Sequence, residues 1–210
     1  MTQTPFSEAD YSLLASIVFR PGYPGYRPNV VESPNGDGKL DSDKRYAHIA
    51  TKYLDKSKMG RLEYRTLHLA LEIAHDLAVS VFRELNLPST FFPVESRGAL
   101  RVLEYPVDAI SNVHTDFDLF TLMMYRDQPD RFYTSRNQPP EHINSLNPGI
   151  HYGEIMELLG AGEATPHSVL PSDTVQHSIV YFAIPAWESI LPDGRSVETY
   201  LNERLSRSRY

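Results

Sequence analysis

Hydrophobic positions recur at helical spacing in two segments of the first 87 residues, 7–19 and 62–85. Apolar residues three and four positions apart share one face of a helix, so each segment predicts an amphipathic helix. Ser7 and Asp10 have the spacing of a capping box at the start of the first helix, and Pro21 ends it. The apolar stripe of the second helix consists of Leu67, Ala70, Leu71, Ala74, Leu77, Ala78, Val81 and Phe82.

Between these helices, residues 20–43 are dense in Pro, Gly, Tyr and Asn, which are turn and loop signals. The tyrosines favour a loop packed on the body of the protein. Asp37, Asp41 and Asp43 suggest a calcium loop, but the closing Glu of an EF-hand is missing. We therefore expect a solvated loop in this segment.

After residue 88 the pattern changes to short apolar or alternating runs separated by Pro, Gly and Asp. The runs 100–105, 119–125 and 177–184 predict strands, and together they favour an antiparallel sandwich or barrel. Residues 155–159 fit either a strand or a single helical turn. Residues 200–207 predict a short basic helix at the C-terminus.

A chain of 210 residues and 23.9 kDa suits one domain with a proper core. We expect a single domain over 1–210. It divides into a mostly helical and loop lead-in over 1–87, a β core over 88–190 and a C-terminal helix over 191–210. The fold class predicted is mainly β with flanking α-helices.

Charge and hydropathy narrow the possible partners. The net charge is −7 and no basic stripe is visible, which argues against nucleic-acid binding. No apolar run is long enough to span a bilayer. The first residues, 1–6, lack the basic and apolar regions of a signal peptide, so we expect a cytoplasmic protein. The absence of cysteine excludes disulfides, thiolate metal sites and a Cys nucleophile.

The most informative residues are His114 and Asp116, two positions apart, and the later His167. Alternate residues of a strand share a face, so the first two can reach one metal, and a second strand can supply the third ligand. Two imidazoles and one carboxylate form the facial set of non-haem Fe(II) sites, which leaves positions open for O2 and a co-substrate. His68 and His75 lie on the second predicted helix, where a packing or surface role is favoured over metal binding.

Several stretches resemble the iron(II)/2-oxoglutarate-dependent oxygenases, in the branch that includes isopenicillin N synthase, plant flavonoid and gibberellin oxygenases and ACC oxidase. The resemblance implies that His114, Asp116 and His167 bind Fe(II), and that the fold is a double-stranded β-helix, a cupin-like jelly roll. It also implies an oxidoreductase that uses O2, with 2-oxoglutarate as co-substrate. The region before the core is shorter than in family members. The matching stretches are residues 100–106, 114–124, 150–159, 164–169 and 193–205.

One position departs from the family pattern. Family members carry Arg-X-Ser after the distal His, and the planar guanidinium binds the far carboxylate of 2-oxoglutarate. This chain has Gln176-His177-Ser178 there. Arg101 and Arg126 lie on predicted strands near the site and are the candidates to replace the missing cation. Alternatively, Gln176 donates a hydrogen bond to a different ligand.

Other side chains are further candidates for the pocket. By the resemblance, Tyr105 holds the co-substrate carboxylate, although a core tyrosine is an equally good interpretation. Asn112 shares a strand face with His114 and is a candidate to contact substrate. His151 and His177 could point into the pocket, but structural roles are favoured.

The predicted function is a non-haem Fe(II)-dependent dioxygenase that uses 2-oxoglutarate and O2 to hydroxylate, desaturate or cyclise a small molecule. One alternative is an Fe(II) oxidase of the isopenicillin N synthase or ACC oxidase type, independent of 2-oxoglutarate. The other is a non-catalytic binding protein on the same scaffold. The sequence indicates neither the substrate nor the oligomeric state.

Overall fold

The computed structural model describes residues 5–30, 44–128, 132–134 and 149–207. The helices are α1 (Glu8–Val18), α2 (Arg61–Glu84), α3 (Glu154–Leu158) and α4 (Val197–Arg207), with 3-10 turns at Thr51–Tyr53 and Ser89–Phe91. The strands are β1 (Tyr26–Val30), β2 (Lys44–Ile49), β3 (Ala99–Tyr105), β4 (Ser111–His114), β5 (Phe120–Arg126), β6 (Phe132–Thr134), β7 (Gly149–Tyr152), β8 (His167–Val169) and β9 (Gln176–Ala183).

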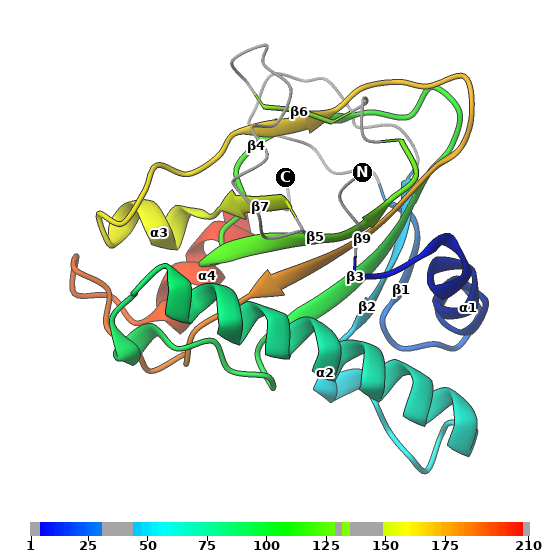
Figure 1. Cartoon of the computed structure of the whole chain (residues 1–210), viewed down its shortest axis with the longest axis horizontal. Helices are drawn as coiled ribbons and strands as arrows, with labels where there is room; N and C mark the ends of the chain where they lie inside the picture. The colour runs from blue at the N-terminus through cyan, green and yellow to red at the C-terminus, as the bar shows by residue number, and fades with distance from the viewer. Residues whose placement is uncertain (1–4, 31–43, 129–131, 135–148, 208–210) are drawn as a thin grey trace.

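These strands form two antiparallel sheets. The larger has the order β1-β2-β3-β9-β5-β7, and the smaller has the order β4-β8-β6. The small sheet lies over one face of the large sheet, and α2 runs across the opposite face (Figure 1). The prediction of an antiparallel β sandwich with flanking helices is therefore confirmed.

The large sheet separates the core from a pocket because its side chains alternate between two faces. Leu100, Val102, Leu122 and Tyr181 face the side of α2 and are fully buried in the main core cluster. The neighbouring residues on the same strands point towards the small sheet. The residues of this second face on β3, β9 and β5 are Arg101, Leu103, Tyr105, Gln176, Ser178, Val180, Thr121 and Met123.

Most predicted elements occur where the pattern placed them. The segment 7–19 forms α1 with its Ser7–Asp10 capping box, and 62–85 forms α2. The three predicted strands correspond to β3, β5 and β9, whereas the ambiguous segment 155–159 is the helical turn α3. The C-terminal helix is present as α4. None of the described helices combines the length and apolar character needed to cross a bilayer.

The interpretation of residues 20–43 as a loop is wrong for residues 26–30, because Tyr26–Val30 is strand β1. It pairs antiparallel with β2, with Tyr26 opposite Ala47. β1 is an edge strand of the sheet, and an edge strand tolerates a proline such as Pro28, which lacks the backbone N–H. The lead-in segment thus contributes two strands to the large sheet. The calcium-loop candidates Asp37, Asp41 and Asp43 lie outside the described residues.

Candidate metal centre and pocket

A pocket lies between the two sheets. Its walls combine a polar end with apolar surface, the usual composition of a small-molecule site. The large sheet contributes Arg101, Leu103, Tyr105, Thr121, Met123, Arg126, His151, Gln176, His177, Ser178, Val180 and Phe182. The small sheet and adjoining segments contribute His114, Asp116, Gln128, His167 and Val169.

His114, Asp116 and His167 converge at this pocket. His114 ends β4, His167 begins β8, and the two are direct partners in the antiparallel register. Asp116 follows β4 by two residues. One ligand atom from each of the three side chains lies within 4.8 Å of the others. The convergence expected from the sequence is therefore observed. Two imidazole nitrogens and one carboxylate oxygen form a donor set that suits Fe(II).

The hydrogen bond and the distances at the site show which imidazole nitrogen of each histidine faces Asp116. The Nδ1–H of His167 donates to the backbone oxygen of Thr165 at 3.0 Å, which leaves Nε2 as the lone-pair nitrogen. This Nε2 lies 3.7 Å from Oδ2 of Asp116. The Nε2 of His114 lies 3.9 Å from the other carboxylate oxygen. Both imidazoles thus present Nε2 to the space beside the carboxylate.

Thr121 orients the Asp116 carboxylate. Its Oγ1 lies 2.5 Å from Oδ2 of Asp116 and 3.0 Å from Oδ2 of Asp118. A hydroxyl has one proton to donate, so one of these two carboxyls must itself donate to Thr121. Burial, and then the charge of Asp116, raises the pKa of Asp118 well above its usual range. Thr121 donates to the Asp116 carboxylate at the shorter distance, and the raised pKa of Asp118 favours its protonated form beside the Thr121 hydroxyl.

The pKa shifts of Asp116 and His167 favour the protonation states that a metal requires. Burial alone would raise the pKa of Asp116, but the neighbouring His167 and His114 and the Thr121 hydroxyl hold it below its usual value. Burial lowers the pKa of His167. An anionic carboxylate and a neutral imidazole are the metal-binding forms of these side chains.

Glu154, at the start of α3, fixes the chain segment that carries the ligands. Its backbone N–H donates to the Asp116 carbonyl at 2.8 Å, and its carboxylate accepts from Thr115 Oγ1 at 2.6 Å. Arg204 of α4 donates to the same carboxylate at 2.6 Å, and Tyr200 adds a further hydrogen bond. The C-terminal helix therefore anchors the first metal motif through one partly buried acidic residue.

Arg126 faces the pocket because β5 contains an irregularity of the bulge type. The register pairs Met123 with Val180, then Tyr125 with Ile179 and Arg126 with Ser178. The additional residue in β5 reverses the alternation and brings Arg126 to the pocket face, a role bulges often have beside active sites. Burial lowers the pKa of Arg126 to about 10, so the group stays cationic near neutral pH.

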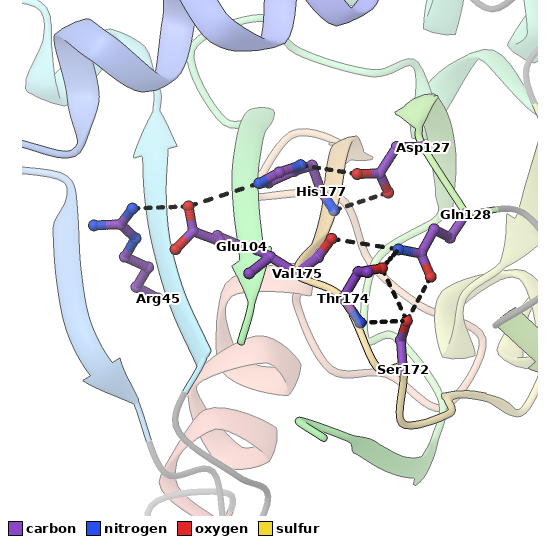
Figure 2. Close-up of polar contacts among 8 residues, drawn as sticks. All are labelled: Arg45, Glu104, Asp127, Gln128, Ser172, Thr174, Val175 and His177. Atoms are coloured by element: carbon purple, nitrogen blue, oxygen red, sulfur yellow. Dashed lines mark hydrogen bonds and ion pairs between the residues drawn. The ribbon is translucent and has the colours of Figure 1, made fainter. Parts of the chain in front are cut away.

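A polar network joins Asp127 and His177, the chain neighbours of Arg126 and Ser178 (Figure 2). Asp127 accepts from the backbone N–H of His177 at 2.9 Å and contacts its Nδ1 at 2.8 Å. The other ring nitrogen of His177, Nε2, lies 3.8 Å from Oε2 of Glu104. The same oxygen accepts a hydrogen bond from Arg45 at 2.7 Å. His177 therefore has a structural role at the end of β9.

A second part of the network in Figure 2 fixes residues 172–175, the segment before β9. Gln128 donates to Thr174 Oγ1 at 2.7 Å and accepts from Ser172 Oγ at 2.8 Å. Because Gln128 lies two residues beyond the end of β5, the network ties the end of this strand to the start of β9.

Gln176 is buried in the wall of the pocket. Its side chain is 5% exposed and one of its amide N–H groups donates to the Leu170 carbonyl at 2.9 Å. Tyr105 is also buried and lines the pocket opposite Gln176. Asn112 lies on β4, but its side chain is outside the described part of the structure.

His151 is a site residue that the sequence interpretation underrated. It is 5% exposed, and its ring stacks on that of His167 with centroids 5.2 Å apart. Burial lowers the pKa of His151 well below its usual value. His151 lies beside His167 because it pairs with Thr121 on the neighbouring strand. No pattern in the sequence predicts this pairing. By contrast, His68 pairs with Glu72 and His75 contacts the Tyr181 hydroxyl, so both have packing or surface roles, as expected.

Comparison with known proteins gives no match in sequence and many matches in structure. No protein-family model matches the chain. No curated protein matches it in sequence. A full-length Neurospora crassa protein in complex with alpha-KG, which is 2-oxoglutarate, matches with a TM-score of 0.68 at 16% identity over 98% of this chain and 85% of that chain.

Two further structures extend the likeness. JOX2 in complex with 2OG, Fe and JA matches with a TM-score of 0.60 at 13% identity, over 96% of this chain and 75% of its own. A rice dioxygenase for auxin oxidation matches with a TM-score of 0.56 at 16% identity, over 95% of this chain and 81% of its own. The chain therefore has the double-stranded β-helix fold of the iron/2-oxoglutarate oxygenases, as its sequence motifs predicted.

Proposed function

We propose that the protein is a non-haem Fe(II) oxygenase that uses 2-oxoglutarate and O2 to hydroxylate, desaturate or cyclise a small molecule. The observation that carries this proposal is the convergence of His114, Asp116 and His167 at the wall of a pocket between the two sheets. Structures of the same fold hold alpha-KG in the Neurospora crassa protein and 2OG with Fe in JOX2.

The chain's own residues prepare the metal position. His114 and His167 would bind Fe(II) through Nε2, and Asp116 through the oxygen not engaged by Thr121. When bound, Fe(II) supplies a centre at which O2 is reduced as 2-oxoglutarate is decarboxylated and the substrate is oxidised. The buried His151 and the apolar walls exclude water from this end of the pocket.

Arg126 and Ser178 are the proposed anchor for the far carboxylate of 2-oxoglutarate. Ser178 occupies the position of the family serine, and Arg126 is its direct partner on the adjacent strand. The cation is thus supplied by β5 rather than by β9. A guanidinium can bind the carboxylate with two parallel hydrogen bonds, and Tyr105 on the other side of β9 closes this end of the pocket.

A small-molecule substrate fits this pocket better than a macromolecule. The pocket lies between the two sheets and combines polar groups at one end with apolar walls, the usual composition of a small-ligand site. The Neurospora crassa protein of the same fold has been crystallised with alpha-KG and thymine. The net charge of −7 gives no electrostatic reason to expect nucleic acid as a partner.

An Fe(II) oxidase independent of 2-oxoglutarate is the second candidate. It is favoured by Gln176, which replaces the family arginine and is committed to a backbone carbonyl. The complete triad with its hydrogen-bonded carboxylate and oriented imidazoles weighs against a non-catalytic protein, which needs none of these arrangements.

The test is anaerobic titration of the Fe(II)-loaded protein with 2-oxoglutarate. Chelation of iron by the keto acid produces a visible charge-transfer band. We expect the band in the wild type and in Arg97→Gln, whose guanidinium lies over Trp187 outside the pocket. In Arg126→Gln the 2-oxoglutarate affinity should fall on the order of 10- to 100-fold, because a charge-assisted pair is lost. A wild type without the band would favour the oxidase.

A further inference from the structure

We propose that Arg101 binds the carboxylate of the substrate, and that the substrate is therefore a small monocarboxylic acid with an apolar body. The inference rests on the proposed function and names the class of molecule that this pocket oxidises. It assigns different tasks to the two pocket arginines, which the sequence alone presents as equivalent candidates.

Arg101 is held in a rigid aromatic clamp. Its guanidinium carbon lies 4.7 Å from the ring centroid of Tyr46 and 4.5 Å from that of Phe182. Its Nε–H donates to Nε2 of His48 at 2.6 Å. Two rings and one hydrogen bond fix the plane of the guanidinium, so its outer Nη edge is prepared for a ligand at little entropic cost.

The charge of Arg101 has no carboxylate partner within the described part of the chain. Arg45, Arg195 and Arg204 are each paired with an acidic side chain at 2.6–2.7 Å. The side chain of Arg101 instead donates to His48, and burial lowers the pKa of His48 to about 2, so that ring is neutral. A clamped cation at a pocket wall that forms no ion pair with the described residues indicates a site for an anion.

The strand register separates this site from the proposed 2-oxoglutarate anchor. Arg101 on β3 lies opposite Val180 of β9, and Val180 in turn lies opposite Met123 of β5. Arg126 lies on β5, two strands away from β3, which corresponds to a lateral distance of about 10 Å. Two separate carboxylates can therefore be bound at once, one by each guanidinium.

The metal position and the apolar surface fit the same ligand. Phe182, one side of the clamp, lies opposite Thr121, which holds the Asp116 carboxylate. Val180, Met123 and Leu103 provide the apolar surface beside the guanidinium. An acid bound to Arg101 would thus present a nearby C–H group to the metal.

The test uses matched acids and amides as probes. Phenylacetate and hexanoate are compared with phenylacetamide and hexanamide for binding to the Zn(II)-loaded protein by calorimetry, with and without saturating 2-oxoglutarate. We expect at least one acid to bind more tightly than its amide. Arg101→Gln should weaken that binding on the order of 10- to 100-fold, whereas Arg97→Gln should leave it unchanged.

The Fe(II)/2-oxoglutarate band distinguishes the two proposals. In Arg101→Gln we expect the band to be unchanged, which also shows that the variant is folded. Loss of the band in a variant that still unfolds cooperatively in urea would mean that Arg101 anchors 2-oxoglutarate, and this overturns the inference. Acids that bind no better than their amides, or that bind Arg101→Gln as well as the wild type, also overturn it. A wild type that binds an acid through Arg101 but gives no band contradicts only the use of 2-oxoglutarate.

If Arg101→Gln does not fold, Arg101→Lys takes its place. Lysine keeps the charge and loses the planar fork that the clamp orients. A severalfold loss of acid affinity supports the inference, and unchanged affinity overturns it.

Discussion

The two faces of the large sheet use the same strands for opposite purposes. On β5, Leu122 is fully buried in the core on the side of α2, while its neighbours Thr121 and Met123 line the pocket. The core face contributes stability through buried apolar area. The pocket face instead gathers His, Arg and carboxyl groups whose hydrogen bonds and charges suit a ligand. Stability and chemistry are thus separated by a single residue step along each strand.

The largest effect is expected from His167→Ala on the pocket side. Removal of a proposed ligand should lower Fe(II) affinity by more than the roughly 10- to 100-fold seen for outer-shell changes. The unfolding free energy of the metal-free protein should fall by less than the roughly 2–5 kcal/mol expected for a core leucine, because the ring lines the pocket and not the main core. Anaerobic Fe(II) titration and urea denaturation measure the two quantities. His68→Ala on α2 is the control, and unchanged iron affinity in His167→Ala would contradict the triad.

The opposite result is expected from Leu122→Ala on the core face. This change leaves a cavity beneath the sheet and should lower the unfolding free energy by about 2–5 kcal/mol. Iron affinity, measured under conditions where the variant is folded, should stay close to that of the wild type. Met123→Ala at the next position, partly exposed in the pocket, should cost less stability. Equal losses for the two variants would mean that the faces are not distinct.

A change in pH should have a smaller effect on the unfolding free energy, through His48. The folded protein keeps His48 neutral with a pKa of about 2, whereas the unfolded chain binds a proton below about pH 6.5. The stability that His48 contributes is therefore complete above pH 6.5 and is lost as the pH falls towards 2. The loss should be at most about 1.4 kcal/mol for each pH unit.

His48→Gln isolates this contribution, since Gln can still accept from Arg101 and does not titrate. Urea denaturation at pH 7, 6 and 5 should give a shallower decline for the variant than for the wild type. His151 and His167 titrate in both proteins and cancel in the comparison. An identical decline would show that His48 binds a proton in the folded protein as readily as in the unfolded chain.

The elements that the sequence predicted well are those stabilised by their own periodicity. The apolar stripe of α2 and the capping box of α1 are local features, and both helices begin and end within one residue of the prediction. The strand β1 was missed because Pro28 and its neighbours have loop composition, and only pairing with β2 makes this segment extended. The short strands β6 and β8 likewise depend on partners that are distant in the chain.

The candidate site shows the same division. His114, Asp116 and His167 could be chosen from residue type, spacing and resemblance, because metal binding demands specific donor atoms. The roles of Arg126 and Arg101 could not be distinguished in that way. A one-residue irregularity in β5 turns Arg126 to the pocket, and the aromatic clamp that orients Arg101 comes from two different strands.

The sequence by itself determined the fold class, the principal helices and strands, and the donor atoms available to a metal, since these follow from local periodicity and side-chain chemistry. Only the tertiary structure decided which face each side chain occupies, and hence which cation lies where. Register and bulges arise from pairing between strands far apart in the chain, and a shift of one residue moves a side chain from the core to the pocket. The location of charge in this pocket is therefore a property of the assembled sheet.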